Sequence, residues 1–219
     1  MASVGALFVA SYVSADPVAI GVFGEKSSSD FRSNSEWRWG LRGGGVQVLA
    51  LDSLTRSVFD LSLVIIDDRS LEERESKRLG KWVAAGGVLI VAGPRPLFSQ
   101  LADENRSLPM AARNEVLIEL AGVKPDYHDP GVLGSYPRIV RNHPLISPFQ
   151  KGDGLRMGQT GVAHALRIRA TDAEVLAESS RLRPGKNGVV EHSSVPALTM
   201  RRFGEGLVLF SSFSLASVA

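Results

Sequence analysis

FDLSLVIIDDRSLEERESKRLGKWVAAGGVLIVA, residues 59–92, carries the clearest structural pattern in this chain of 219 residues. It begins and ends with short apolar runs rich in β-branched residues, at 61–66 and 88–92. Runs of this kind are typical of strands buried on both faces, as in a parallel sheet covered by helices. The intervening stretch has the length of a crossover helix. Residues 59–92 therefore predict a strand, a helix and a second, parallel strand.

The helix between these strands has a clear start and stop. SLEE at 70–73 has the Ser-x-x-Glu spacing of a capping box, and the glycine pair at 86–87 ends the segment. Glu73 and Lys77 are spaced for an ion pair on one helix face. Leu79, Trp82 and Val83 form an apolar face at helical spacing, so we expect Trp82 to belong to the core.

Two more apolar runs precede this unit, at 18–23 and 46–51. A second capping-box spacing, at 33–36, predicts a helix between them that ends at the glycines 43–45. The glycine-rich residues 40–45 precede a strand, whereas a phosphate-binding glycine loop follows a strand and opens a helix, so we interpret them as a helix stop. Residues 18–92 thus predict alternating strands and helices in a mainly parallel sheet.

The second half of the chain predicts shorter elements. Residues 112–121 have the pattern of a helix that ends at Gly122. Short strands are expected at 138–140, 165–169 and 174–177, and the chain closes with a β-hairpin over 197–210, turning at 204–206. We expect an α/β fold in a single domain over 18–219, preceded by residues 1–17 as an extension or edge strand.

The composition excludes several classes of site. Because the chain has no cysteine, it has no disulfides, thiolate metal site or cysteine nucleophile. The net charge is only +2 and the cations are scattered, so we expect no nucleic-acid partner. The loop Asp126-Tyr127-His128-Asp129 holds possible hard-metal ligands, but nothing supplies the rest of a coordination sphere, so we expect no metal there.

The N-terminal residues 4–15 are the other apolar segment of interest. A secretory signal normally begins with a positively charged region, but no Lys or Arg precedes these residues. The apolar run is also too short to span a bilayer. We therefore expect a cytoplasmic protein without membrane insertion. The alternative is secretion, if residues 4–15 act as a signal segment.

Several stretches, in order along the chain, resemble class I glutamine amidotransferase-like domains. They are the strand-helix-strand unit at 59–91, LAGV at 120–123, NHPL at 142–145, AEVLA at 173–177 and the C-terminal segment at 196–209. The most similar variants are the trimerisation domain of family 42 β-galactosidases and the trehalose-utilisation-type proteins. The resemblance extends over 18–210 and implies a flavodoxin-like three-layer sandwich with a mainly parallel sheet.

The resemblance also implies a loss of chemistry. Catalytic members of the superfamily use a cysteine on a sharp turn after a central strand, but this chain has GPRPL at 93–97 there and no cysteine. No catalytic residue is therefore carried over, glutamine hydrolysis is excluded, and no cofactor is implied. The expected role is oligomerisation or binding of a partner or ligand, in a homo-oligomer or larger assembly. The expected setting is a carbohydrate-related system.

Ligands of open α/β sheets bind beyond the carboxyl ends of the strands. The charged side chains expected there are Glu25, Asp67, Asp68 and Arg95. They could bind a polar sugar, or they could pair with one another while residues 68–70 cap the helix. His192, beside Glu191, is a further ligand-binding candidate, although an exposed loop before the hairpin is the simpler interpretation. The competing hypothesis is a sugar- or small-molecule-handling enzyme of the trehalose-utilisation type that uses Asp67, Arg95 and His192.

Two tryptophans are candidates for an interface. Trp37 and Trp39 cannot both face one side of a helix, because two residues span about 200°. One of them is therefore expected to be exposed or to lie at an interface, where tryptophan is often an anchor.

Overall fold

The computed structural model describes residues 19–24, 47–51, 53–54, 60–67, 69–97, 113–125, 137–146, 149–155, 167–184 and 190–213. The N-terminal residues 1–17, the predicted helix ending at 43–45 and the loop at 126–129 lie outside these ranges. The extent of the predicted single domain also remains a prediction.

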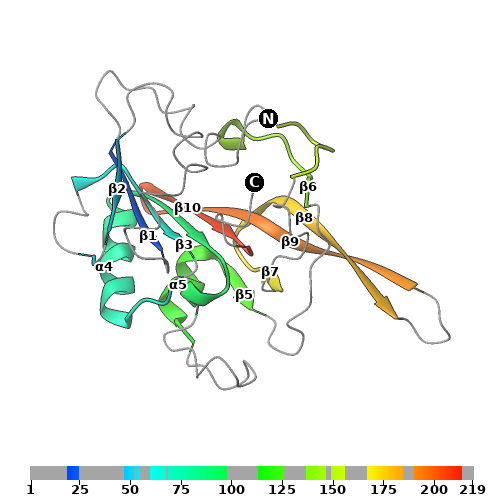
Figure 1. Ribbon diagram of the computed structural model, residues 1–219, viewed down its shortest axis with the longest axis horizontal. Helices are drawn as coiled ribbons and strands as arrows, with labels where there is room; N and C mark the ends of the chain where they lie inside the picture. The colour runs from blue at the N-terminus through cyan, green and yellow to red at the C-terminus, as the bar shows by residue number, and fades with distance from the viewer. Residues whose placement is uncertain are drawn as a thin grey trace.

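An eight-stranded mixed sheet forms the centre of the described structure, in the order β2-β1-β3-β4-β10-β9-β8-β6 (Figure 1). The first five strands are parallel to one another: β2 (Gln47–Ala50), β1 (Ala19–Gly24), β3 (Leu63–Asp67), β4 (Val88–Ala92) and β10 (Gly206–Ser211). The others are antiparallel to their neighbours: β9 (Val190–Phe203), β8 (Glu174–Pro184) and β6 (Arg138–Ile139). The predicted α/β class and C-terminal hairpin are confirmed.

The first described helix, α4 (Glu73–Ala84), starts with a different cap from the predicted one. The capping box is shifted by two residues: Glu72 is the N-cap, and its backbone N–H donates to Oε2 of Glu75 at 3.0 Å. The hydroxyl of Ser70 instead donates to the carbonyl of Arg95 at 3.3 Å. Ser70 therefore links the loop after β3 to the loop after β4, and α4 begins only at Glu73.

Two helices cover one face of the sheet. The second, α5 (Glu115–Ala121), begins after the N-cap Asn114, ends at the left-handed Gly122 and contacts α4. Buried side chains of both helices pack with alternate residues of the strands: Phe23, Val64, Ile66, Leu71, Leu79, Val83, Leu89, Val91, Leu117, Leu120, Val208 and Phe210. Trp82 is half-buried at the border of this cluster, so its predicted place in the core is only partly right.

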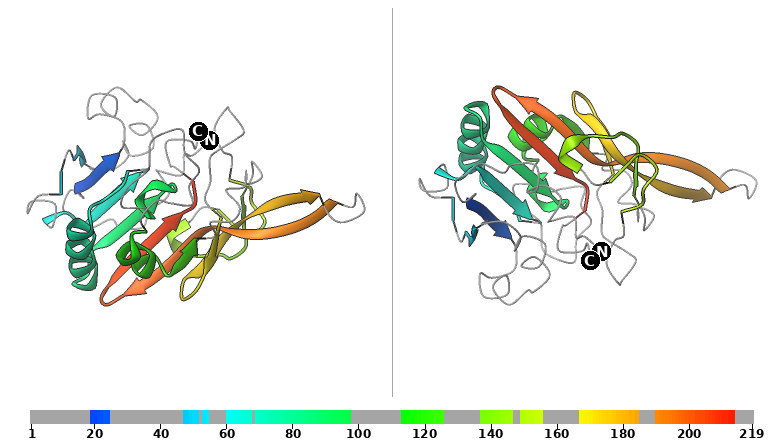
Figure 2. Two further views of the ribbon diagram at one scale, coloured as in Figure 1. Left: turned by 90° about the horizontal axis from the view of Figure 1, so that it is seen from below. Right: turned by 90° about the horizontal axis from the view of Figure 1, so that it is seen from above.

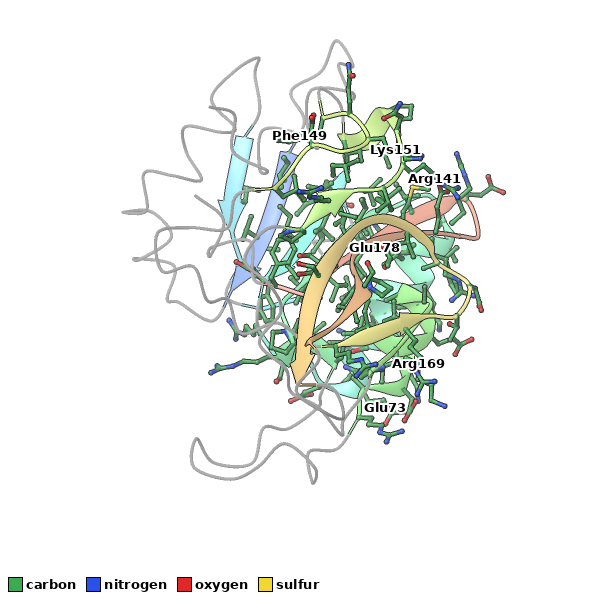
Figure 3. All side chains as sticks on the ribbon, turned by 90° about the vertical axis from the view of Figure 1, so that its right-hand side faces the viewer. Glu73, Arg141, Phe149, Lys151, Arg169 and Glu178 are labelled. Carbon is green, nitrogen blue, oxygen red and sulfur yellow. The ribbon has the colours of Figure 1, made fainter. Side chains whose placement is uncertain are left out.

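The opposite face of the sheet is covered, among the described residues, by irregular chain. Residues 140–146 and 149–155, which follow the edge strand β6, include the short 3-10 helix η4 (Pro144–Ile146). Ile139, Ile146 and Leu155 are buried there against the strands, together with Phe213. Figure 3 shows Phe149 and Lys151 of this segment on the opposite side of the sheet from Glu73 of α4.

A small second sheet pairs β5 (Val123–Pro125) with β7 (Ile168–Ala170) in antiparallel orientation. It directly follows α5, and Thr171 N–H after β7 donates to the carbonyl of Gly122 at 2.9 Å. The second sheet therefore fixes the chain at the C-terminal end of α5.

The C-terminal hairpin turns through two residues, Gly204 and Glu205, and docks onto the end of α4. Gly204 has φ +60°, the left-handed conformation that glycine adopts without strain. Glu205 N–H donates to the carbonyl of Ala84 at 3.0 Å, and Leu207 N–H donates to the carbonyl of Gly87 at 3.1 Å. The predicted turn is thus also the joint between the hairpin and the helix layer.

Arg201 of β9 binds the C-terminal end of α5. Its guanidinium donates to the carbonyl of Glu119 and forms an ion pair with Asp172 at 2.9 Å, and the side chain is only 19% exposed. A cation at a helix C-terminus satisfies an orphan carbonyl and complements the helix dipole.

We expect Arg201→Met to lower the free energy of unfolding by about 1–2 kcal/mol, because it removes a charge-assisted hydrogen bond to a helix end. Urea unfolding monitored by circular dichroism measures the loss. Arg202→Met is the matched control: Arg202 is exposed, so its replacement should change stability by less than about 0.5 kcal/mol. Equal effects at both positions would contradict a capping role for Arg201.

Candidate functional site

The carboxyl ends of three neighbouring parallel strands lie at one edge of the sheet, as expected for a ligand site in this class of fold. Gly24 of β1 is level with Asp67 of β3, which is level with Ala92 of β4. The carboxylate of Asp67 belongs to a buried residue with 7% exposure. The Ser70 hydroxyl bond to the Arg95 carbonyl brings the loops after β3 and β4 together. Asp67 and Arg95 are therefore on adjacent segments.

Arginine and aromatic side chains contribute to the same edge. The Arg69 guanidinium lies 3.8 Å from the centre of the Phe23 ring, a cation–π arrangement. Asp67, Arg69 and Arg95 each already have an interaction partner within the chain. Glu25 and Asp68 lie outside the described residues, so their part in a ligand site stays a prediction.

The turn after β4 is the place at which the sequence resemblance to glutamine amidotransferase-like domains predicts a lost nucleophile. Gly93 has φ +80°, and its N–H points at the carbonyls of Ser211 (3.0 Å) and Phe213 (3.1 Å). Pro94 and Pro96 have no N–H to offer. An oxyanion hole needs preorganised donors directed at the substrate, usually backbone N–H groups. At this turn the Gly93 N–H is already bonded within the chain, and the two prolines have no N–H. These three residues therefore offer no free backbone donor to a substrate.

His192 lies on a strand, so the expectation of an exposed loop at Glu191 and His192 is wrong. Both belong to β9, where His192 is paired with Leu182 of β8. In the same strand, Leu198 pairs with Ser211 at the carboxyl edge of β10. His192 and Leu198 are six residue steps apart, which corresponds to about 20 Å along the strand. The register therefore places Asp67 at the carboxyl edge of the parallel strands and His192 well away from that edge along β9.

Trp37, Trp39 and the loop residues Asp126, His128 and Asp129 lie outside the described residues, and their roles stay predictions. In the described ranges no three acidic or histidine side chains are grouped as metal ligands. No helix in those ranges is long and apolar enough to cross a membrane.

A basic strip on the outer face of α4 was missed by the sequence analysis, which treated the cations as scattered. Arg74, Lys77, Arg78 and Lys81 line a depression of about 560 Å³ together with Glu73. The Lys77 ammonium lies 2.5 Å from the Glu73 carboxylate and holds the pKa of Glu73 below its ordinary value by hydrogen bonding and charge. The side chains of this pair are 62% and 69% exposed, and the depression is a shallow surface feature.

A long hairpin arm is the second feature that the sequence analysis missed. Strands β8 and β9 continue past the rest of the sheet as a two-stranded ribbon, which Figures 1 and 2 show extending away from the body. The sequence predicted only residues 174–177 for β8 and 197–200 for β9. The extra residues are largely polar, and the pairing register identifies them as strand.

The fold is found in known enzymes and small proteins. No protein-family model matches the chain, and no curated protein matches it. Among solved structures, the chain is similar to a β-galactosidase from Rahnella sp. R3, with a TM-score of 0.58 and 14% identity, covering 92% of this chain and 30% of that one. It is also similar to Gan42B, a GH42 β-galactosidase of G. stearothermophilus, with a TM-score of 0.56, 15% identity and coverage of 90% and 27%.

A smaller protein shares the fold over nearly its whole length. STM1381, a cytoplasmic protein from Salmonella typhimurium LT2, matches with a TM-score of 0.56 and 16% identity, over 90% of this chain and 88% of that one. The chain thus spans less than a third of the two β-galactosidases but most of STM1381. These likenesses establish an α/β fold shared with part of the β-galactosidases.

Proposed function

We propose that this chain is a non-catalytic assembly domain, built on a glutamine amidotransferase-like scaffold, that holds copies of a carbohydrate-related protein together. The observation that carries this proposal is the turn after β4. It has no cysteine, two prolines in place of backbone donors, and a glycine N–H directed at the carbonyls of residues 211 and 213. A scaffold kept without its reaction centre fits a role in binding or assembly.

The order of the parallel strands supports the scaffold assignment. Flavodoxin-like sheets have the order 2-1-3-4-5. Here β2-β1-β3-β4 follow that order, and β10 occupies the fifth position. Antiparallel strands β9, β8 and β6 then extend the sheet beyond the flavodoxin-like part.

The comparisons support a carbohydrate context and an intracellular location. Two of the similar structures are β-galactosidases of which this chain matches 30% and 27%, the size of an accessory domain. STM1381, which it matches nearly end to end, is described as cytoplasmic. We therefore propose that the protein is cytoplasmic and acts as a self-associating domain alongside or within a sugar-processing system.

Light scattering tests the assembly role directly. We expect size-exclusion chromatography with multi-angle light scattering to give a mass that is a multiple of the 23.5 kDa chain at micromolar concentration. Dilution should shift this mass toward that of one chain. A strict monomer at concentrations up to about 0.5 mM, where even weak interfaces associate, would overturn the proposal.

A further inference from the structure

The outer face of α4 carries charge of one sign. A helix turns by about 100° per residue, so residues 74, 77, 78 and 81 fall within an arc of about 100°. These residues are the four cations of the basic strip, and all of them are exposed. The arc lies opposite the buried side of the helix, which consists of Ser76, Leu79, Gly80 and Val83. Figures 1 and 2 show α4 at the outer margin of the described structure, so the strip faces solvent.

Most of the charge of the basic strip is uncompensated. The ammonium of Lys77 pairs with the Glu73 carboxylate at 2.5 Å. The side chains of the other three cations form no ion pair or hydrogen bond with any described residue. Arg201, by contrast, is held by an ion pair to Asp172 and by a helix carbonyl. Four cations and one carboxylate leave the strip with a net charge of +3.

The arrangement of these cations works against the stability of the helix. Side chains four residues apart are neighbours on a helix surface, and like charges at this spacing destabilise it. Arg74 and Arg78 form one such pair, and Lys77 and Lys81 form another. Arg74 also lies in the first turn, where the helix dipole disfavours a cation. Because a mixture of signs would avoid this repulsion, the strip fits a role in binding better than a role in stability.

The shape and length of the strip match a short segment of chain. With Glu73, the four cations line a depression of about 560 Å³. Arg74 and Lys81 are seven residues apart, which is about 10 Å along the helix. An extended chain covers this distance with about four residues, and a helix covers it with about seven. A segment of roughly eight residues is therefore long enough to contact every cation of the strip.

The charges around the strip favour carboxylates over a long polyanion. Lys77 holds the pKa of Glu73 below its ordinary value by hydrogen bonding and charge, so a carboxylate in contact with the strip stays ionised. Glu72, Glu73 and Glu75 stand together at the N-terminal end of α4. They would repel a nucleic-acid strand that continued past the strip, whereas a short acidic segment ends before it reaches them.

We infer that the basic strip of α4 is the docking surface for a short acidic segment of a protein partner. Carboxylates of the segment bind Arg74, Arg78 and Lys81, and each guanidinium can hold a carboxylate with two parallel hydrogen bonds. Since the cations are exposed, the contact is weak and sensitive to salt. The inference goes beyond the proposed self-association and does not depend on it.

Fluorescence anisotropy of a labelled peptide of eight glutamates, added to the full chain, tests the inference. We expect saturable binding with a dissociation constant below about 1 mM at about 50 mM salt. Binding should weaken at least about 10-fold in the variant Arg74→Gln with Arg78→Gln and Lys81→Gln, because the uncompensated charge is lost. A wild type that does not bind the peptide, or a variant that binds it as tightly, would overturn the inference.

A second triple variant is the matched control for net charge. Lys124→Gln with Arg169→Gln and Arg202→Gln also changes the charge by −3, at exposed positions outside α4. We expect its affinity for the peptide to stay within about 3-fold of wild type, because charges farther away than the Debye length are screened. Equal losses in the two variants would show that only the total charge matters, which contradicts docking on α4.

Thermal unfolding distinguishes docking from a structural role of the cations. Glutamine has a helix propensity close to that of lysine and arginine, and it removes the like-charged pairs. The α4 variant should therefore melt at the same temperature as wild type or at a higher one. A melting temperature lower by more than about 3 °C would show that the cations stabilise the helix, and this result would count against the inference.

Two further measurements identify other occupants of the strip. A labelled oligothymidylate of about twelve nucleotides should bind no more tightly than the peptide at equal salt. Binding at least about 10-fold tighter that the α4 variant loses would indicate a nucleic-acid site and overturn the inference. In sedimentation velocity, the α4 variant should keep the oligomeric state of wild type. An oligomer that dissociates in this variant would mean that a second copy occupies the strip, whereas failure of peptide binding alone leaves the proposed assembly function standing.

Discussion

Replacing Gly206 by alanine is expected to lower the free energy of unfolding by about 3 kcal/mol, as overpacking against a rigid backbone does. Gly206 is buried where the C-terminal hairpin meets the end of α4. A Cβ at this position would overlap the carbonyl oxygens of Val83 and Gly87. Neither can move freely, because Leu207 N–H is bonded to the Gly87 carbonyl and the turn is bonded to Ala84.

Gly154→Ala is the matched control for this substitution. Gly154 is exposed, and a Cβ there meets no atom within 4 Å. We expect its stability to change by less than about 0.5 kcal/mol in urea unfolding. Equal stability of the two variants would contradict the close packing of Gly206 against the end of α4.

The fold was largely predictable where local pattern and burial agree. The strand at 88–92 was predicted at its observed bounds, because a continuous β-branched run is buried on a central strand. The hairpin turn at Gly204 was also predicted from its glycines. What the sequence could not show is that the turn docks on α4. Glycine is needed at 206 because the backbone carbonyls of Val83 and Gly87 lie next to it. No pattern in the neighbouring sequence indicates this contact.

The start of α4 illustrates the same limit. The spacing at 70–73 fits a capping box, and so does the observed one built from Glu72 and Glu75. The choice between them depends on Ser70, whose hydroxyl is bonded to the Arg95 carbonyl from 25 residues away. The local sequence is compatible with both capping boxes, and the tertiary contact between Ser70 and Arg95 favours the one built from Glu72 and Glu75.

The candidate sites were predicted less well than the fold. Asp67 is the last residue of β3, as the strand assignment predicted, and the part of Asp67 and Arg95 in a ligand site stays a prediction. The arm was missed, since its residues have neither strong β-propensity nor a single apolar face over the whole strand. Only the register, which pairs Leu182 with His192 and Arg183 with Glu191, shows that these residues continue both strands.

Replacing Asn114 by alanine should lower the free energy of unfolding by about 3 kcal/mol, the sum of a lost cap and an unsatisfied buried polar group. Asn114 is 2% exposed, and its Oδ1 accepts the N–H of Leu117 at 3.2 Å in the first turn of α5. Its Nδ2 donates to the Ser76 hydroxyl of α4 at 2.7 Å and lies 3.4 Å from the Leu71 carbonyl. One amide therefore joins both helices.

Two further variants separate the cap from the buried network. Asn142→Ala removes an exposed amide whose Oδ1 accepts the Lys151 N–H at 2.5 Å, and it should cost less than about 1 kcal/mol. Asn114→Asp keeps the cap oxygen but places a carboxylate near the Leu71 carbonyl. Burial and this carbonyl should raise the pKa of the new carboxyl above its unfolded value, so its protonated, better tolerated form prevails at low pH. The deficit relative to wild type should therefore be smallest below the unfolded pKa, about 3.9, and grow as pH rises through the folded pKa. A deficit independent of pH between 3 and 7 would mean that the side chain at 114 is exposed to water, contrary to the joint between α4 and α5.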